Sequence, residues 1–416
     1  MQFGNLPVFT LAGVFILIAI RQVGPISIPL WLTMLLGALV VLFTGRIEPL
    51  AALRAINLDV MLFLFGMFVI GQGLDESGYL AHVSYRYFKR CRSRNALLAV
   101  IIAGAGLASA FLMNDTLAII GTPVVLLLAR KHAMSPKVLL LALAYAVTIG
   151  SAMSPIGNPQ NLLIALNGGL NNPFLIFLRH LLLPTALNLY LAYLLLRRFF
   201  PDNFRESELS HSQEPIRNHE LAVLSRLSLR IVVLLVAVRI VTSPFGLATE
   251  FRLTHIALAG SLPILVGSSR RWHILRSIDW HTLVFFAAMF VLMESVWLTG
   301  FFQGLLTGLD MNLASPGMIL GISVVLSQFI SNVPLVALYQ PLAAGMGVSP
   351  EGLMALAAGS TIAGNLFILG AASNIIIIQN AEKKARETVT FFEFAKVGIP
   401  LTAMSVFVYW IFLRYV

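Results

Sequence analysis

Apolar segments of about 20 residues recur along the whole chain and are separated by short polar loops. A helix of that length crosses the hydrocarbon core of a bilayer, so the pattern predicts an all-α polytopic membrane protein. Two more apolar segments, 95–129 and 316–345, are each interrupted by polar residues near the middle. The predicted spans are 7–23, 28–44, 59–73, 138–166, 174–196, 231–245, 254–267, 282–297, 353–379 and 397–414.

Polar residues and helix breakers interrupt four of the apolar segments. These interruptions are Asn114-Asp115-Thr116, 154–159, 331–334 and 364–373. Proline and glycine end or unwind a helix, and unwound backbone at membrane depth is tolerated only where it is buried or lines a polar cavity. Basic residues flank 95–129 on both sides, and basic loops are expected on the cytoplasmic face. We therefore predict that 95–129 is a re-entrant hairpin with its polar tip inside the membrane.

The two halves of the chain carry matching residues in the same order. Ser109, Asn114 and Pro123 recur at one constant offset as Ser327, Asn332 and Pro341, and similar matches link 56–78 to 278–300 and 148–161 to 361–374. Five predicted spans per half is an odd number, so the second half is predicted to be inverted relative to the first. Inverted repeats with broken helices are typical of secondary transporters.

This repeat divides the chain into two transport halves and a linker. The first half is 1–200, with its hairpin at about 95–130 and its broken helix at about 138–166. A polar linker, 201–226, is predicted to be cytoplasmic. The second half is 227–416, with a hairpin at about 316–346 and a broken helix at about 353–380.

Composition supports a membrane protein and excludes several other classes. The chain of 416 residues is 58% hydrophobic and 11% charged, whereas soluble domains carry about 25% charged residues. The net charge of +10 does not indicate nucleic-acid binding, because Lys and Arg lie in short loops beside apolar segments. The single cysteine, Cys91, excludes an internal disulfide and a thiolate metal cluster. We expect no metal site and no cofactor.

Asn114 and Asp115 have two interpretations. They either cap the helix that begins near Leu117 or belong to a functional site, since a carboxylate at membrane depth costs a few kcal/mol and is retained for a reason. The matching stretch around Asn332 favours the functional interpretation.

Four motifs in this order resemble those of the ion transporter superfamily. They are Phe111-x-x-Asn-Asp…Pro123, Gly157-Asn-Pro-Gln-Asn161, Ser331-Asn-Val-Pro334 and Gly364-Asn-x₅-Gly-Ala-Ala-Ser-Asn374. The superfamily includes arsenical-pump membrane proteins, sodium/proton antiporters, and sodium-coupled dicarboxylate and citrate transporters. The Asn114-Asp115 pair looks most like the arsenite permeases, whereas dicarboxylate carriers typically show Ser-Asn-Thr in both hairpins. The resemblance implies an elevator-type transporter and a homodimer, and such permeases can dock a cytosolic ATPase. We do not expect an enzyme, because the apolar segments have no His-Glu-x-x-His motif, no Gly-x-Ser-x-Gly motif and no paired acids at helical spacing.

The resemblance places a substrate site between the two hairpin tips and the two helix breaks. Amides and hydroxyls with one carboxylate and no guanidinium suit a small neutral polyhydroxy solute better than a multiply charged anion. Burial disfavours the charged form of a carboxylate, so Asp115 is the candidate proton-coupling residue. The candidate substrate-binding residues are Asn114, Thr116, Asn158, Asn161, Ser331, Asn332, Asn365, Ser373 and Asn374.

The function predicted from these motifs is secondary active export of arsenite or antimonite as the neutral trihydroxide, in exchange for protons. The alternative within the superfamily is a sodium- or proton-coupled transporter of a small anion such as a dicarboxylate or oxyanion, or a sodium/proton antiporter. We expect a multi-pass protein of the cell inner membrane with both termini external. Its expected partners are the substrate, protons or sodium, the lipid bilayer and a second copy of the chain, but no nucleic acid.

Overall fold

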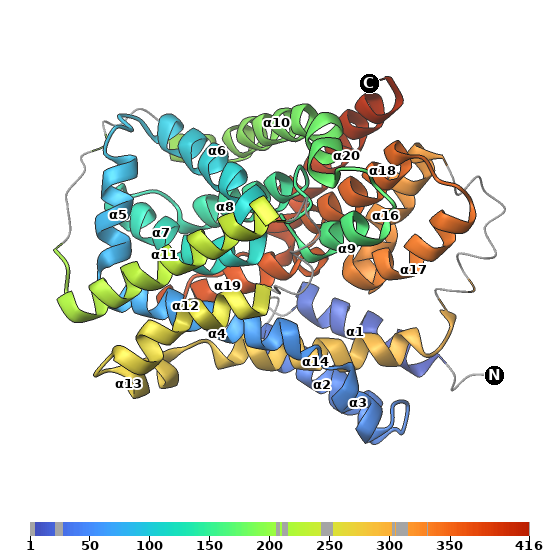
Figure 1. Ribbon diagram of the computed structural model, residues 1–416, viewed down its shortest axis with the longest axis horizontal. Coiled ribbons are helices and arrows are strands. Elements are labelled where there is room, and N and C mark those ends of the chain that lie inside the picture. The colour runs from blue at the N-terminus through green and yellow to red at the C-terminus, as the bar shows by residue number, and fades with distance from the viewer. Residues whose placement is uncertain are drawn as a thin grey trace.

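The computed structural model describes residues 5–20, 28–204, 209, 215–242, 253–301, 304, 315–330 and 332–415. Every regular element in these ranges is helical, which confirms the all-α prediction (Figure 1). Six of the helices are long and apolar enough to cross a membrane, and five shorter apolar helices accompany them. The predicted multi-pass membrane protein is therefore supported by the helices as well as by composition.

The first half contains α1 to α10 and the second half contains α11 to α20. In the first half these are α1 (Leu6–Ile20), α2 (Leu30–Phe43), α3 (Pro49–Ala55), α4 (Leu58–Glu76), α5 (Tyr79–Phe88), α6 (Arg94–Leu112), α7 (Asn114–Lys131), α8 (Pro136–Ser151), α9 (Pro159–Asn167) and α10 (Pro173–Phe199). In the second half they are α11 (His219–Thr242), α12 (Leu253–Gly267), α13 (Arg271–Ser277), α14 (Trp280–Trp297), α16 (Pro316–Ile330), α17 (Asn332–Gly345), α18 (Pro350–Ile362), the short 3₁₀ turns η3 (Ala363–Asn365) and η4 (Ile368–Gly370), α19 (Ala372–Ala385) and α20 (Phe391–Tyr415).

Most predicted spans coincide with helices to within a few residues, and the main differences are at polar ends. Helix α11 begins at His219, inside the predicted linker, and α20 begins at Phe391 rather than 397. Hydropathy marks only the apolar part of a helix, whereas α11 continues into a polar turn where Glu220 accepts hydrogen bonds from Ser269. The predicted span ends at 21–23 and 243–245 lie outside the described residues.

The segment predicted as the first hairpin is two antiparallel helices. Helix α6 ends at Leu112 and α7 begins at Asn114, and Met113 between them has φ 64° and ψ 146°. At the far end, the Arg94 guanidinium donates to the backbone oxygens of His132 (3.1 Å) and Ala133 (3.3 Å). The start of α6 and the end of α7 therefore lie side by side, so the chain doubles back at Met113. That this hairpin is re-entrant in a membrane stays a prediction.

Local structure recurs at the positions that the sequence comparison pairs. The Asn57 side chain accepts from the Val60 amide at the start of α4, and its counterpart Asp279 accepts from Thr282 at the start of α14. At the other ends of these helices, Ser77 donates to the Leu74 oxygen and Thr299 to the Val296 oxygen. Short helices α3 and α13, which the hydropathy pattern does not predict, precede α4 and α14. The inverted orientation of the repeat stays a prediction.

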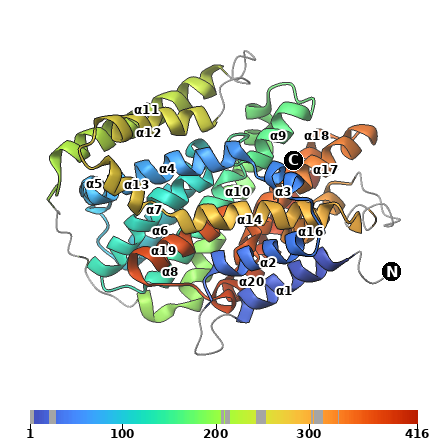
Figure 2. The same ribbon diagram turned by 90° about the horizontal axis from the view of Figure 1, so that it is seen from below.

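The helices form two bundles, and each half of the chain contributes to both. Bundle one consists of α1–α4 and α11–α14, in which α4 packs on α12, α2 on α14 and α11 on α12. Bundle two consists of α6–α10 and α16–α20, in which α6 packs on α8, α16 on α18 and α7 on α19. In Figure 1, α1–α4 and α12–α14 lie together in the lower part, and Figure 2 looks at them from below.

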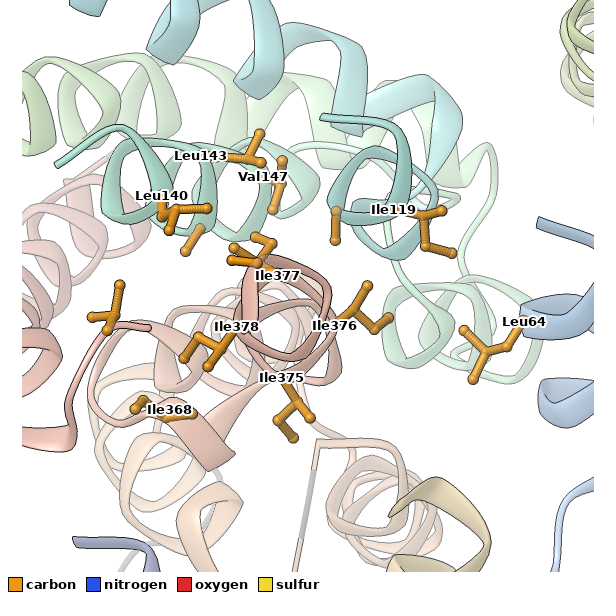
Figure 3. Packing of buried hydrophobic residues seen from close by; sticks show 14 of the residues in the cluster. Leu64, Ile119, Leu140, Leu143, Val147, Ile368, Ile375, Ile376, Ile377 and Ile378 are labelled. Carbon is orange, nitrogen blue, oxygen red and sulfur yellow. The ribbon is translucent and has the colours of Figure 1, made fainter. Parts of the chain in front are cut away.

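Helices α8 and α19 lie at the centre of bundle two. Every residue from Val138 to Ser151 is buried, and a helix that is apolar on all sides belongs in a core. Ile375 to Ile378 of α19 are also buried. In Figure 3, Ile377 points toward Leu143 and Val147 of α8 and Ile376 toward Ile119 of α7, whereas Ile375 lies on the opposite side of α19. Both central helices are the ones predicted to be broken.

Helix α19 also carries polar contacts from bundle two to bundle one. The Lys384 ammonium lies 2.5 Å from the Asp75 carboxylate at the end of α4. The neighbouring Lys383 donates to the oxygens of Ser277 and Ile278 at the end of α13. One turn earlier, Thr282 of α14 donates to the Gln379 side chain.

Candidate functional site

The helix break after α8 is held by one buried asparagine. A Cβ atom at Gly157 would lie 2.2 Å from the Ser151 oxygen, so only glycine lets the chain pass this close to the end of α8. The Asn161 amide nitrogen donates to the oxygens of Ser151 (3.1 Å), Ala152 (3.3 Å) and Ser154 (3.0 Å). These carbonyls lose their helical partners at the break, and Asn161 satisfies them.

An asparagine at the paired position holds the second break in a similar way. The Asn374 amide nitrogen donates to the Gly364 oxygen at 2.6 Å, where Asn374 and Gly364 are the counterparts of Asn161 and Ser151. Asn374 is 1% exposed, and no described residue makes a hydrogen bond to its side-chain oxygen. The two asparagines therefore have a shared structural role, which does not by itself require a ligand.

The two broken helices contact each other directly. The Asn158 amide nitrogen donates to the hydroxyls of Ser151 (3.1 Å) and Thr361 (3.0 Å), and Thr361 also lies 3.4 Å from the Asn161 oxygen. Thr361 is the counterpart of Thr148, and α8 contacts η3 at this crossing. The structure thus brings the first and second breaks together, as the motifs predicted.

The tip of the first hairpin is attached to the first break. The Asn114 backbone amide donates to the Gly157 oxygen at 3.0 Å, and the Asn114 side chain accepts from the Asp115 amide. Asp115 is 8% exposed, and its Oδ1 atom has no hydrogen-bond partner among the residues that the structure describes. The N-cap position of α7 is Met113, which makes no side-chain capping bond, so the side-chain bond to a first-turn amide comes from Asn114, and the capping interpretation holds for Asn114 in part.

Thr116 completes the first tip and faces bundle one. It is buried and lines a small apolar pocket together with Met113 and Ile156. The opposite wall comes from bundle one, with Phe63 and Met67 of α4. The first tip therefore lies at the boundary between the two bundles.

The second hairpin reaches the second break through a residue that the motifs did not indicate. The Gln328 amide nitrogen donates to the Ala363 oxygen at 2.7 Å. Asn332, the first residue of α17, is 9% exposed, and its side-chain oxygen has no hydrogen-bond partner in the described ranges. Ser331, the predicted ligand beside it, lies outside the described residues.

Several buried polar atoms around these motifs have no hydrogen-bond partner among the described residues. Such groups are costly to bury, so each is a candidate for contact with a solute, an ion or water. Asn365 is the clearest, because it is fully buried and both of its amide atoms are unpaired. The unpaired atoms are Asp115 Oδ1, Thr148 Oγ1, Ser327 Oγ, Gln328 Oε1, Asn332 Oδ1, Asn365 Oδ1 and Nδ2, Ser373 Oγ and Asn374 Oδ1.

The four motif stretches contain one acidic residue and no basic residue. No Lys, Arg or His occurs in 109–123, 148–161, 327–341 or 361–374, and Asp115 is the only acidic residue in these stretches. Thr148, Thr361 and Gln328 were not among the predicted ligands. The two threonines were visible in the sequence as a matched pair of the repeat, and Gln328 as a polar residue in an apolar helix.

Comparisons with known proteins agree on transport. Residues 14–352 match the family CitMHS, described as a citrate transporter. An uncharacterised transporter of Mycobacterium tuberculosis is 30% identical over 371 residues, which cover 84% of each chain. A silicon efflux transporter of Oryza sativa subsp. japonica is 27% identical over 463 residues, covering 94% of this chain and 93% of the relative. The solved YdaH transporter of Alcanivorax borkumensis has the same fold, with a TM-score of 0.50 at 14% identity over 98% of this chain and 97% of that chain.

Proposed function

The chain belongs to the CitMHS transporter family of the ion transporter superfamily, and from that premise we propose that it exports arsenite or antimonite as the neutral trihydroxide in exchange for protons. Like its relatives, it is a membrane transporter and not an enzyme. The observation that carries the proposal is the chemistry of the buried site: amides, hydroxyls and a single carboxylate, with no basic side chain in the four motifs.

This chemistry favours a neutral solute. Moving an ion out of water without a compensating charge is far more costly than moving a hydroxyl that keeps its hydrogen bonds. A trihydroxide offers hydroxyl donors to amide oxygens such as those of Asn332 and Asn365. The relative named for silicon efflux supports the proposal, because silicon in neutral water is the uncharged tetrahydroxide. The other candidate ligands remain those predicted from the sequence, namely Asn114, Thr116, Asn158, Asn161, Ser331, Ser373 and Asn374.

Asp115 carries the exchanged proton in this proposal. It is the only acid in the four motifs, its carboxylate is buried, and its Oδ1 atom has no hydrogen-bond partner in the described part of the chain. A proton on Asp115 removes the cost of a buried charge, so protonation and solute binding can alternate at one tip.

The two bundles support an elevator mechanism, with bundle one as the fixed scaffold and bundle two as the moving unit. The four site motifs all belong to bundle two, so the site would move with it. The remaining parts of the proposal are a homodimer in the cell inner membrane with both termini external, and an ATPase subunit as an optional partner.

The first test is arsenite accumulation in inside-out vesicles that contain the protein. With an imposed proton gradient and no sodium, we expect uptake that collapses when a protonophore is added. Vesicles without the protein measure leakage. Uptake that ignores the protonophore would contradict proton exchange, and absence of arsenite and antimonite uptake would contradict the substrate.

Citrate or a dicarboxylate taken up with sodium is the second candidate, and the family description favours it. A bound sodium ion would offset the charge that the side chains leave unbalanced. Sodium-dependent citrate uptake in the same vesicles would establish this alternative. A sodium/proton antiporter would instead move sodium without either solute.

The contact between Lys384 and Asp75 gives a test of the elevator. These residues join α19 of bundle two to α4 of bundle one. In a Cys91→Ser background, we expect a short bifunctional thiol reagent to link Asp75→Cys to Lys384→Cys and to reduce transport more than tenfold. The matched control is Lys137→Cys with Glu393→Cys, an ion pair at 2.6 Å between two helices of bundle two. Equal transport in both linked proteins would contradict movement between the bundles.

A further inference from the structure

Two amide side chains hold adjacent carbonyls of the second break in the same way. The Gln328 nitrogen donates to the Ala363 oxygen (2.7 Å) and to the Val324 oxygen (3.1 Å). The Asn374 nitrogen donates to the Gly364 oxygen, one residue along the chain. Both side chains are buried, at 5% and 1% exposure.

These contacts fix which end of each amide points away from the backbone. A carbonyl oxygen only accepts hydrogen bonds, so the NH₂ group and not the oxygen must face it. The Gln328 Oε1 and Asn374 Oδ1 atoms are consequently turned away from these carbonyls, and neither has a hydrogen-bond partner among the described residues. The second break therefore presents a pair of oriented acceptors without a matching donor.

Gln328 also marks where the repeat departs from symmetry. Its counterpart in the first hairpin is Ala110, whereas the counterpart of Asp115 in the second hairpin is Val333. At these unmatched positions, the first hairpin has an acid that the second lacks, and the second has an amide that the first lacks. If the position of Gln328 served packing alone, an apolar residue could replace the buried amide, and the paired position in the first hairpin is the apolar Ala110.

We propose that Gln328 is a specificity-determining residue whose side-chain oxygen, together with that of Asn374, accepts hydrogen bonds from hydroxyl groups of the transported solute. The proposal rests on the proposed function and deepens it by naming the feature of the solute that is recognised. A trihydroxide donates to both oxygens, whereas an ionised carboxylate has no proton to donate and is repelled by them.

The test varies both the residue and the solute in proteoliposomes containing the full chain. The solutes are arsenite, methylarsonous acid, which has one hydroxyl fewer, and citrate. For wild-type protein we expect a lower KM for arsenite than for methylarsonous acid. Gln328→Met keeps the length of the side chain and removes its polar atoms, and it should raise the KM for arsenite about tenfold. The discrimination between the two arsenic compounds should shrink in the same variant.

The matched control is Gln340→Met. Gln340 is also a buried glutamine of the second hairpin whose nitrogen donates to a backbone oxygen, that of Leu163. Its substitution should leave the KM ratio of the two arsenic compounds unchanged. If Gln328→Met lowers only Vmax, or if both variants change the ratio equally, Gln328 is a structural residue and the inference is overturned. Wild-type protein that carries citrate and neither arsenic compound overturns the proposed function, and the inference with it.

Discussion

Replacing Asp115 with asparagine should reduce proton-driven arsenite uptake in inside-out vesicles more than tenfold. The substitution keeps the shape of the side chain and removes the group that exchanges a proton. Because Asp115 is buried and its Oδ1 atom has no partner within the described ranges, an amide can occupy the same space without breaking a hydrogen bond to these residues at that atom. The measurement is uptake under an imposed pH gradient, compared with downhill exchange of labelled arsenite at equal pH.

The two assays separate coupling from binding. If Asp115 carries only the proton, downhill exchange should survive in Asp115→Asn while gradient-driven accumulation is lost. The matched control is Asp279→Asn, which changes another buried acid whose side chain accepts from the Thr282 backbone amide at the start of α14. That variant should retain coupling. Full proton-driven accumulation in Asp115→Asn would remove Asp115 from the coupling mechanism.

Local features of the fold were predictable because their causes are local. Prolines at 155 and 159 and a glycine at 157 interrupt α8 wherever the helix lies in the protein, so the position of the break follows from sequence. The turn of the first hairpin followed in the same way from polar residues within an apolar run. The start of α11 at His219 did not, since charged residues in a helix beyond its apolar part resemble a loop.

The partners within the site were not predictable, because they come from distant parts of the chain. The Asn158 amide meets Thr361, 203 residues later, and only the folded bundle places them at 3.0 Å. Sequence motifs also could not distinguish Asn161, whose nitrogen satisfies three carbonyls, from Asn365, whose amide atoms are unpaired. Asn161 follows the first break and Asn365 lies at the start of the second, and only the hydrogen bonds of the folded chain show that their roles differ.

A methyl group at Gly150 should displace the first hairpin from the central broken helix. A Cβ atom there would lie 2.0 Å from the Gly106 oxygen and 2.5 Å from the Gly106 Cα atom, so α8 and α6 touch through their backbones. Backbone cannot rotate aside as a side chain can, and forcing extra atoms into a packed core costs about 1–3 kcal/mol or more. We expect Gly150→Ala to lower the melting temperature in detergent and to reduce transport more than tenfold.

The control for this prediction is Gly104→Ala, because Gly104 lies in α6, the same helix as Gly106. Apart from the backbone of α6 itself, no atom of the described residues lies within 4 Å of a Cβ atom built at Gly104. Alanine is about 1 kcal/mol better than glycine inside a helix, so this variant should melt at the same or a higher temperature. If Gly150→Ala melts normally but does not transport, the close crossing of α6 and α8 does not determine global stability. Its role is then to position the Asn114 amide against the Gly157 oxygen. Normal melting together with normal transport would show that α6 and α8 separate at no cost, and the close crossing would then have no role in holding the hairpin tip at the break.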